Sequence, residues 1–307
     1  MERGKNKILL GPSSFGAIDK TPLKMLAESG MQVVDNPYKR RLTKGELLDL
    51  LPGIVGIIAG LEPLDREVLE KSELKVISRC GSGLSNVDLN AAKEKGMIVK
   101  NTPLAPAFSV AELTIGCLFA LLRQVPQMDA ALHQRKWEKK IGRQLAGMTV
   151  AVIGFGNIGR LVGRMLKALG AEVIAVDPLL TGIVEGITIL DLNKALSQAD
   201  VITLHCSGEG LLLGESEFGL MKKRIYLLNA ARGSLIDEKT LLAAITSGQV
   251  AGAWLDTFQD EPYSGPLCDF PQVILTPHVG SYTEECRKSM EMESATNLIE
   301  ALREGTK

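Results

Sequence analysis

The most informative stretch of the chain is residues 149–178, TVAVIGFGNIGRLVGRMLKALGAEVIAVDP. It opens with an apolar run typical of a buried strand, continues through a glycine-rich turn into a helix-like segment, and ends in a second apolar run. Gly154, Gly156 and Gly159 give the turn a G-x-G-x-x-G spacing. A strand, a tight turn, a helix and a second strand in this order predict a strand–helix–strand unit of a parallel sheet.

The same glycines predict a dinucleotide-binding turn. We expect Gly154 to permit the tight turn, Gly156 to let the backbone approach a pyrophosphate, and Gly159 to let helix and strand pack closely. The first helical amides, at Asn157 and Ile158, would face the phosphate charge. Glycines that merely tighten a turn are the alternative, which the complete fingerprint disfavours.

Asp177 ends the second apolar run. A carboxylate at this place accepts hydrogen bonds from the adenosine ribose hydroxyls and would repel a 2'-phosphate. Pro178, Leu179 and Leu180 supply no cation that could neutralise such a phosphate. The sequence therefore favours NAD over NADP as the cofactor.

Short apolar runs alternate with helix-like segments along most of the chain. The expected strands are 7–10, 32–35, 55–59, 75–78, 97–100, 149–153, 172–176, 201–205, 225–229, 251–255 and 273–275. The expected helices outside the fingerprint include 21–28, 43–50, 65–71, 87–95, the strongly apolar 109–124 and the final 283–303. This alternation predicts two α/β domains, each a doubly wound parallel sheet covered on both faces.

The composition excludes several classes of protein. Hydrophobic residues make up 45% and charged residues 23% of the 307 residues, which argues against disorder. The formal net charge of -1 gives no bulk attraction to nucleic acid or acidic lipid. The run 113–122 is about half of the ~20 residues that a membrane span needs, and the apolar run near the amino terminus is too short for a signal peptide. We therefore expect a cytoplasmic protein with no nucleic-acid or membrane partner.

Five scattered cysteines have no paired spacing, and the three histidines share no ligand-like spacing with each other or with a cysteine. These spacings predict free thiols and no metal site.

Three segments at the ends of candidate strands carry polar groups: LLNAARGSLID around Arg232, AWLDTFQDEP up to Glu261, and LTPHVGS around His278. Ligands in open α/β sheets bind beyond the carboxyl ends of the strands, so these groups should lie near the nicotinamide. Each alone could be a surface charge or a turn residue. Together they suit reduction of a 2-keto acid, which needs a cation for the carboxylate and carbonyl and a proton donor such as a histidine beside a carboxylate.

The chain resembles the D-isomer-specific 2-hydroxyacid dehydrogenases, close to the short members of the phosphoglycerate dehydrogenase branch that lack a regulatory domain. The matching segments are RCGSGLSNVDLNAAKEKGMIVKNTP, SVAELTIG, the Gly154 fingerprint, NAARGSLID, LDTFQDEP and TPHVGS. Their order and spacing are more specific than any one motif.

The resemblance implies that Arg232 binds and polarises the substrate, that His278 exchanges the proton, and that Glu261 holds the imidazole and favours its protonated form. Asp256 would hydrogen-bond the nicotinamide carboxamide and orient the ring. Further cofactor contacts, mostly packing or backbone, are implied at His205, Cys206, Ala230, Arg232, His278 and Gly280.

The resemblance also implies a substrate-binding loop, whose backbone amides at Ser82, Gly83 and Leu84 bind the carboxylate. The glycines at 81 and 83 would let that backbone come close. Arg79, just before the loop, could approach the substrate or be a surface arginine.

The family topology implies a flavodoxin-like substrate-binding domain made of 1–103 and 283–307. A Rossmann NAD-binding domain, 104–282, is inserted into it. The helix that follows Ser109 would help to form a homodimer.

The expected reaction is hydride transfer between the nicotinamide and C2 of a small anionic 2-hydroxy or 2-keto acid. D-3-phosphoglycerate is the first candidate substrate, and glyoxylate or hydroxypyruvate the next. Formate dehydrogenases lack the acidic residue found here at Glu261, and a non-catalytic NAD-sensing protein of the same fold would not need Arg232, Glu261 and His278 together. The loop 206–214 lacks the proline and threonine usual in the family, so we expect altered cofactor affinity there.

Overall fold

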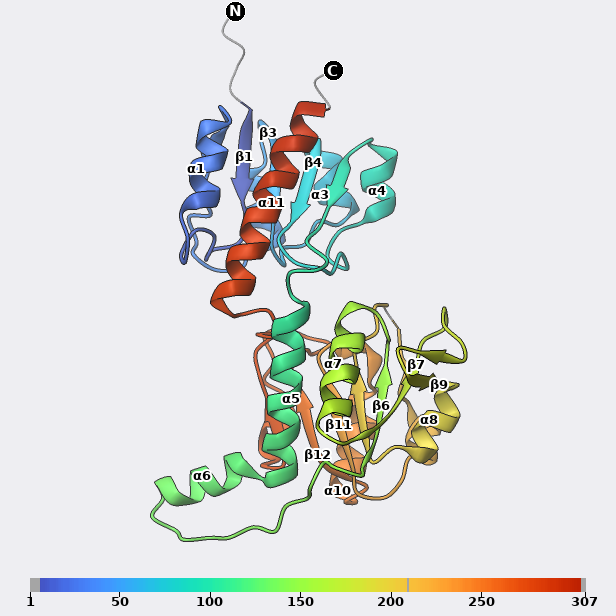
Figure 1. Ribbon diagram of the computed structural model, residues 1–307. Helices are drawn as coiled ribbons and strands as arrows, with labels where there is room; N and C mark the ends of the chain where they lie inside the picture. The colour runs from blue at the N-terminus through green and yellow to red at the C-terminus, as the bar shows by residue number, and fades with distance from the viewer. Residues whose placement is uncertain (1–5, 209, 305–307) are drawn as a thin grey trace, which may run out of the picture. The chain divides into compact units, whose positions relative to one another are not determined.

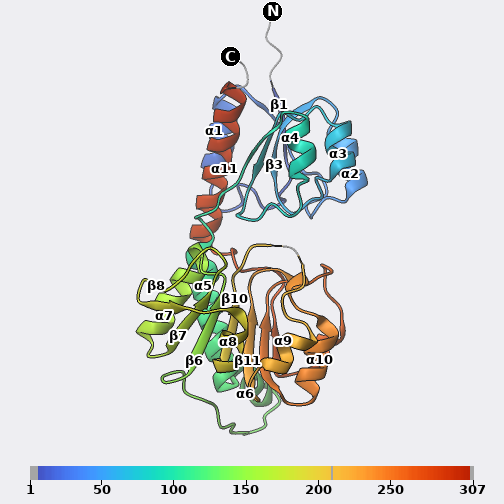
Figure 2. The ribbon, with the colours of Figure 1, turned by 90° about the vertical axis from the view of Figure 1, so that its right-hand side faces the viewer.

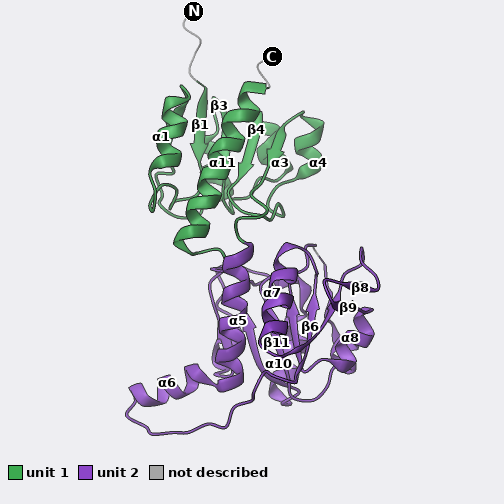
Figure 3. Ribbon diagram, in the orientation of Figure 1, with its two compact units in different colours: residues 1–106, 281–307 green, residues 107–280 purple. Residues whose placement is uncertain are grey.

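The computed structural model describes residues 6–208 and 210–304. The chain divides into two compact units, unit 1 (Met1–Pro106 with Ser281–Lys307) and unit 2 (Ala107–Gly280), coloured separately in Figure 3. The boundaries expected from the sequence, 103/104 and 282/283, lie a few residues from these. Residues 1–5 and 305–307 of the expected substrate-binding domain, and residue 209 of the loop 206–214, lie outside the described residues.

Unit 1 contains a five-stranded parallel sheet in the order β2-β1-β3-β4-β5. Its strands are β1 (Lys7–Leu10), β2 (Gln32–Val34), β3 (Ile54–Ala59), β4 (Val76–Arg79) and β5 (Ile98–Lys100). The chain passes from β1 to β2 on one side and then to β3 on the other. The strand order therefore reverses between β1 and β3, as in flavodoxin-like sheets.

Helices cover both faces of this sheet (Figure 2). They are α1 (Thr21–Glu28), α2 (Lys44–Leu50), α3 (Arg66–Lys71), α4 (Leu89–Glu94) and the final helix α11 (Glu284–Glu304). One core packs α2, α3 and α4 against the sheet, and the other packs α1 and α11 against it. The start of α2 is set by a capping box, in which the Thr43 side chain and the Glu46 side chain each accept a hydrogen bond from the other residue's backbone amide.

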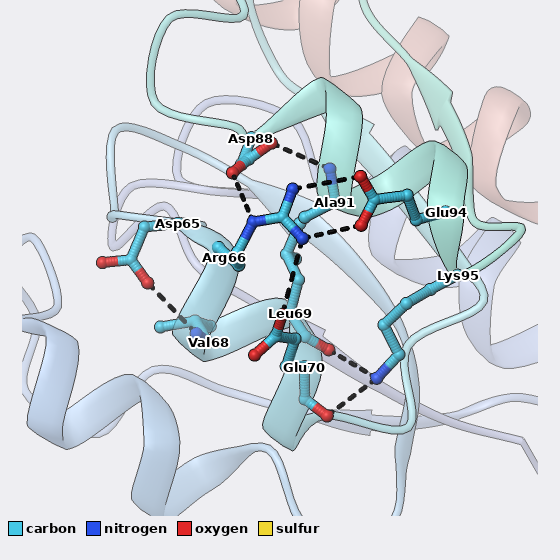
Figure 4. Close-up of polar contacts among 9 residues, drawn as sticks. All are labelled: Asp65, Arg66, Val68, Leu69, Glu70, Asp88, Ala91, Glu94 and Lys95. Carbon is cyan, nitrogen blue, oxygen red and sulfur yellow. Dashed lines mark hydrogen bonds and ion pairs between the residues drawn. The ribbon is translucent and has the colours of Figure 1, made fainter.

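Ion pairs and helix capping join α3 to α4 at the surface of unit 1 (Figure 4). The Arg66 guanidinium contacts both carboxylate oxygens of Glu94, at 2.6 and 3.2 Å. The Lys95 ammonium donates to the carbonyls of Leu69, Glu70 and Ser72, which lie in the last turn of α3 and just beyond it. A cation suits this place because helix carboxyl ends carry unpaired carbonyls and partial negative charge.

Unit 2 is built on an eight-stranded sheet in the order β13-β12-β11-β10-β6-β7-β9-β8. The strands are β6 (Thr149–Ile153), β7 (Glu172–Val176), β8 (Ile183–Val184), β9 (Ile187–Ile189), β10 (Val201–Leu204), β11 (Ile225–Asn229), β12 (Val250–Leu255) and β13 (Val273–Leu275). Every pair is parallel except β8 with β9. The order reverses beside β6, which defines a Rossmann sheet. The predicted class, two doubly wound α/β domains, is confirmed.

The helices of unit 2 again form two layers (Figure 1). They are α5 (Ala107–Arg123), α6 (Val125–His133), α7 (Asn157–Ala168), α8 (Leu192–Gln198), α9 (Glu215–Leu220) and α10 (Glu238–Thr246), with short 3-10 turns at Gly233–Leu235 and Pro266–Asp269. The helices α5 and α7 share one core with the sheet, and α8, α9 and α10 share the other. The apolar side chains of the helix that follows Ser109 are thus largely buried in the core of unit 2.

Two local features differ from the sequence-based expectation. Gln124 adopts a left-handed conformation with φ of 51°, which ends α5 and lets α6 start at a new angle. The β8–β9 hairpin was also missed, although Glu185 and Gly186 form its two-residue turn with φ of 53° and 73°. Along the described residues, no single helix has the length and apolarity to cross a membrane; α5 and α6 reach them only as a pair, bent by 66°.

We expect Leu298→Ala to destabilise unit 1. Leu298 is fully buried in the core under α11 and packs against the strand β3 at Gly56. Removing a buried leucine side chain leaves a cavity and typically lowers the free energy of unfolding by about 3 kcal/mol. Urea unfolding followed by circular dichroism measures the loss, and the exposed Glu300→Ala on the same helix is the control. Equal midpoints for the two variants would contradict the packing described.

Candidate active site

The glycine-rich turn between β6 and α7 is shaped by close backbone contacts. Gly154 has φ of 90°, and a Cβ atom there would lie 2.3 Å from the Cys206 amide nitrogen. A Cβ atom on Gly159 would lie 2.0 Å from the Gly154 carbonyl oxygen. At Gly156 an added Cβ would meet no atom within 4 Å. Two glycines therefore serve the packing of the turn, whereas the third leaves open space at the start of α7, as a pyrophosphate requires.

Asp177 lies directly after β7, and its carboxylate is held against the turn. One oxygen accepts a hydrogen bond from the Phe155 amide and the other from the Leu179 amide, both at 3.0 Å. Carboxylate oxygens have further lone pairs, so the group can still accept from ribose hydroxyls. The placement of the turn and of this carboxylate fits a dinucleotide.

The loop after β11 carries Ala230 and Arg232, and a buried asparagine holds it. The Asn229 side chain accepts from the Ala231 amide at 3.0 Å and donates to the Arg232 carbonyl at 2.8 Å. The Arg232 guanidinium, half-buried, donates to the Ala231 carbonyl at 2.6 Å. Sequence reasoning missed Asn229, although an asparagine at a strand end that precedes a turn is a recognisable signal.

The His278 ring, after β13, lies within hydrogen-bond distance of the Glu261 carboxylate, after β12. The His278 Nδ1 lies 3.0 and 3.2 Å from the two carboxylate oxygens of Glu261, one of which also accepts from the Phe258 amide at 3.1 Å. His278 has φ of 54°, which is rare for a residue with a Cβ atom and typical of functional sites. The pair leaves Nε2 as the ring nitrogen that can meet a substrate.

Asp256 fixes the loop on which His278 lies. Its carboxylate accepts from the Thr276 hydroxyl at 2.6 Å and from the Val279 and Gly280 amides at 2.9 and 2.8 Å. The buried Trp254 indole in turn donates to the Thr276 hydroxyl at 2.9 Å. Most of the acceptor capacity of Asp256 is therefore used inside the protein. Thr276 and Trp254 carry no signal in the sequence, because they act on residues 20 or more positions away.

A ring stack and a hydrogen bond hold the segment that carries Glu261. The rings of Phe258 and Tyr263 stack with centroids 4.3 Å apart, and the Tyr263 hydroxyl donates to Glu238 at 3.0 Å. Burial raises the pKa of Tyr263 to about 12, so the hydroxyl stays protonated and keeps this hydrogen bond near neutral pH.

His205 and Cys206 follow β10, directly beside Gly154. The His205 Nε2 lies 2.8 Å from the Thr203 hydroxyl, and burial lowers the pKa of His205 to about 3. The ring is therefore neutral near pH 7. Its Nδ1 is buried and has no hydrogen-bond partner among residues 6–208 and 210–304. Burial also raises the pKa of the Cys206 thiol, which keeps it protonated.

In unit 1, Arg79 is the last residue of the strand β4, and the loop 81–84 follows it. Arg79 is only 9% exposed, so its interpretation as a surface arginine is wrong. Gly81 has φ of 145° and exchanges hydrogen bonds with Thr102, while the Ser82 carbonyl accepts from the Asn101 side chain. Within the described part of the chain, the amides of Ser82, Gly83 and Leu84 donate to no protein group.

The site residues of unit 2 thus collect at one edge of its sheet. Gly154, Asp177 and His205 follow the neighbouring strands β6, β7 and β10, and the segments with Arg232, Asp256 and His278 follow β11, β12 and β13. Among the described residues, no three His, Cys, Asp or Glu side chains are grouped as metal ligands would be.

Comparison with known proteins agrees with this geometry. Residues 115–280 match the D-isomer specific 2-hydroxyacid dehydrogenase, NAD binding domain. The chain is 37% identical over 309 residues to D-3-phosphoglycerate dehydrogenase of Pongo abelii, and 40% identical over 274 residues to that of Methanocaldococcus jannaschii. These matches cover 97% and 85% of this chain but only 56% and 52% of those enzymes, so the chain spans about half of their length.

Two solved structures resemble the whole chain. The TT0316 protein from Thermus thermophilus has a TM-score of 0.88 at 31% identity, with 97% of each chain covered. A glyoxylate reductase from Paecilomyes thermophila has a TM-score of 0.87 at 28% identity, with 98% of this chain and 97% of that one covered. The fold and the glycine-rich turn define a dinucleotide-binding protein of the dehydrogenase type. The chain belongs to the D-isomer specific 2-hydroxyacid dehydrogenase family, and its unit 2 is the family's NAD-binding domain.

Replacing Gly159 and replacing Gly156 should cause two different kinds of defect. Gly159→Ala places a Cβ against backbone and should lower the free energy of unfolding by about 2 kcal/mol or more. Gly156→Ala meets open space in the protein and should leave stability nearly unchanged, but it should raise the Kd for NADH at least about tenfold because the methyl occupies the pyrophosphate approach. Thermal unfolding and NADH fluorescence titration separate the two effects. A Gly156→Ala protein that binds NADH normally would contradict this assignment.

Proposed function

We propose that the protein is an NAD-dependent D-2-hydroxyacid dehydrogenase that interconverts a small anionic 2-hydroxy acid and its 2-keto acid, with D-3-phosphoglycerate as the first candidate. The His278–Glu261 pair carries this proposal, because an imidazole held by a carboxylate on a strained backbone is suited to proton exchange with a substrate oxygen. Arg232 on the adjacent strand end supplies the cation that a 2-keto acid requires.

The bound cofactor would accept the hydride as NAD and supply it as NADH. In the reducing direction, the His278 Nε2 donates a proton to the C2 carbonyl oxygen, which becomes the hydroxyl oxygen. In the oxidising direction, Nε2 takes the proton back from that hydroxyl. Glu261, whose carboxylate lies 3.0 Å from Nδ1, orients the ring. Arg232 polarises the C2 carbonyl and holds the carboxylate, and the amides of Ser82, Gly83 and Leu84 bind the carboxylate.

The remaining residues hold the cofactor in this proposal. Asp177 accepts from the ribose hydroxyls, the amides of Asn157 and Ile158 face the pyrophosphate, and Asp256 uses its remaining acceptor position for the carboxamide. Packing contacts come from His205, Cys206, Ala230 and Gly280. The buried Nδ1 of His205, which no described residue contacts through a hydrogen bond, is consistent with a group that a ligand completes.

Two alternatives use the same fold. A glyoxylate or hydroxypyruvate reductase would have the same three groups and differ only in the substrate side chain, and the likeness to a glyoxylate reductase structure favours keeping it. A non-catalytic NAD sensor has no use for the His278–Glu261 pair together with Arg232, which follows the neighbouring strand β11.

A spectrophotometric assay tests the proposed function. Purified protein is mixed with NADH and a panel of 2-keto acids that includes 3-phosphohydroxypyruvate, hydroxypyruvate and glyoxylate, and oxidation of NADH is followed. We expect turnover on at least one acid, a preference for NADH over NADPH because of Asp177, and a higher kcat/KM for the phosphorylated acid. NADH binding without turnover on any acid would support the sensor instead.

Replacing His278 tests the mechanism. His278→Ala removes the proton donor and should lower kcat by about 10²–10⁴-fold while the Kd for NADH stays within about twofold. Glu261→Gln keeps a hydrogen bond to Nδ1 but loses the charge, so its kcat should fall less. Parallel loss of kcat and NADH affinity in His278→Ala would assign His278 to cofactor binding or folding.

We further propose that the protein is a homodimer. Large apolar side chains are exposed along α5, α6 and the segment that follows: Phe119, Val125, Leu132, Trp137 and Ile141. Trp137 is 81% and Ile141 97% exposed, on a part of unit 2 that extends away from its sheet (Figure 1). Large apolar side chains exposed in this number along neighbouring segments are typical of a subunit interface, and a twofold dimer would cover them in both copies at once.

The double variant Trp137→Glu/Ile141→Glu tests this surface. Two charges at these positions should shift the protein from dimer to monomer in analytical ultracentrifugation. The thermal unfolding midpoint of the protein, measured with NADH bound, should change little. The matched control is Ile183→Glu, which places a charge at an apolar side chain of β8 that is 73% exposed. A monomeric wild-type protein would refute the dimer.

A further inference from the structure

An ion pair between Arg287 and Glu291 is buried in unit 1, on the first half of the helix α11. The two residues are 7% and 0% exposed, and the Arg287 Nη2 lies 2.6 Å from a carboxylate oxygen of Glu291. Apolar side chains of similar volume would often stabilise a core as well as such a pair does. The reaction proposed above uses neither residue, so the contacts of the pair are the place to look for its role.

Both partners of the pair hold the turn that follows the strand β1, residues 11–16, called the β1 turn below. The Arg287 Nη2 donates to the Ser14 hydroxyl at 2.9 Å. The second carboxylate oxygen of Glu291 accepts from the Gly16 amide, also at 2.9 Å. These contacts join residues 273 and 275 positions apart in the chain. The returning helix α11 therefore fixes the β1 turn at two points.

The β1 turn lies where the strand order of the unit 1 sheet reverses, between β1 and β3. Open α/β sheets bind their ligands beyond the carboxyl ends of the strands at this switch point. The β1 turn also packs against the turn after β3, because a Cβ atom added to Gly11 would lie 1.8 Å from a carboxylate oxygen of Glu62. The pair on α11 thus supports one side of the place where a ligand of unit 1 is expected.

The β1 turn offers hydrogen-bond donors that the protein itself does not use. Ser13 is exposed, and in the described part of the chain the amides of Ser13 and Ser14 donate to no protein group. Two backbone amides and the Ser13 hydroxyl can donate to oxygen atoms of a ligand.

The spacing of the strands decides which part of a substrate meets this turn. The loop 81–84 follows β4 and is the proposed site of the substrate carboxylate, and one strand, β3, separates β4 from β1. Neighbouring strands lie about 4.8 Å apart, so the β1 turn and the loop 81–84 are about 10 Å apart. An acid whose carboxylate is bound at 81–84 therefore reaches the β1 turn only through a group that it carries beyond C2.

We propose that Arg287 and Glu291 are positioning residues that hold the β1 turn, and that the Ser13 and Ser14 amides of this turn bind oxygen atoms carried by C3 of the substrate. This inference rests on the proposed dehydrogenase function and names the substrate class within it: 2-keto acids with a hydroxyl or phosphate group at C3. Neither positioning residue touches the proton or the hydride. Their effect should therefore fall on KM and not on kcat.

The neutral double variant Arg287→Gln/Glu291→Gln tests the inference, because it leaves no unpaired buried charge. We expect KM for hydroxypyruvate and for 3-phosphohydroxypyruvate to rise about tenfold or more, while KM for glyoxylate, which has no C3, stays within about twofold. The kcat for each acid should change less than about threefold, and the Kd for NADH should stay constant. Where an acid turns over too slowly, its inhibition constant replaces KM.

Two further variants control for general damage. Ser14→Ala removes only the hydroxyl that Arg287 contacts and should raise the same two KM values by a smaller factor. Glu300→Gln, at an exposed position of α11, should leave every value unchanged. An equal rise in KM for glyoxylate in the double variant would overturn the proposal, because it would show a loss that does not depend on C3. Unchanged KM values for all three acids would overturn it as well.

Hydrogen exchange of the backbone amides separates this inference from the proposed function. In the double variant, peptides that cover residues 12–19 should exchange faster than in the wild type, whereas peptides that cover α3 should not. If the wild type neither reduces nor binds any keto acid, the proposed function fails, and the substrate class named here fails with it. The exchange rates still decide the positioning role, which equal rates over 12–19 in the two proteins would refute.

Discussion

The common direction of the strands in each main sheet governs where the chemistry of this protein can lie. Parallel strands deliver every following turn to one edge, so residues far apart in sequence meet there without any further device. In unit 2 this edge receives the glycine-rich turn after β6, Asp177 after β7, and the segments of Arg232, Glu261 and His278 after β11, β12 and β13. In unit 1 it receives Gly11, Glu62 and Arg79. Both units therefore concentrate polar groups at their carboxyl edges.

Buried polar groups then fix each of these turns. Asn229 holds the turn of Arg232, Asp256 with Thr276 holds the turn of His278, and Glu62 holds the turn after β3. Each uses a side-chain oxygen or amide at a strand end to satisfy backbone groups that the sheet leaves unpaired. Rigid support of this kind suits groups that must meet a reacting atom within a few tenths of an ångström.

Much of the fold is readable from local pattern. The capping box of Thr43 and Glu46, the strand bounds of β1, β6 and β13, and the fingerprint glycines all act on near neighbours, and each behaves in the structure as its residues predict. The features of the fold that local pattern missed are short interruptions. The left-handed Gln124 and the β8–β9 hairpin break a regular rhythm with one or two residues, which hydrophobic periodicity does not register.

The chemistry divides in the same way. Residue types and their spacing indicated the family, predicted the dinucleotide turn and supplied the candidates Arg232, Glu261 and His278. The family resemblance already implied that Glu261 holds the imidazole of His278, and the structure supplied the geometry of that contact. The burial of Arg79 and the supporting roles of Trp254, Thr276 and Asn229 came only from the three-dimensional arrangement. The reason is physical: a hydrogen bond or counter-charge depends on which strands are neighbours in the sheet, and strand order is a property of the folded chain that no short segment contains.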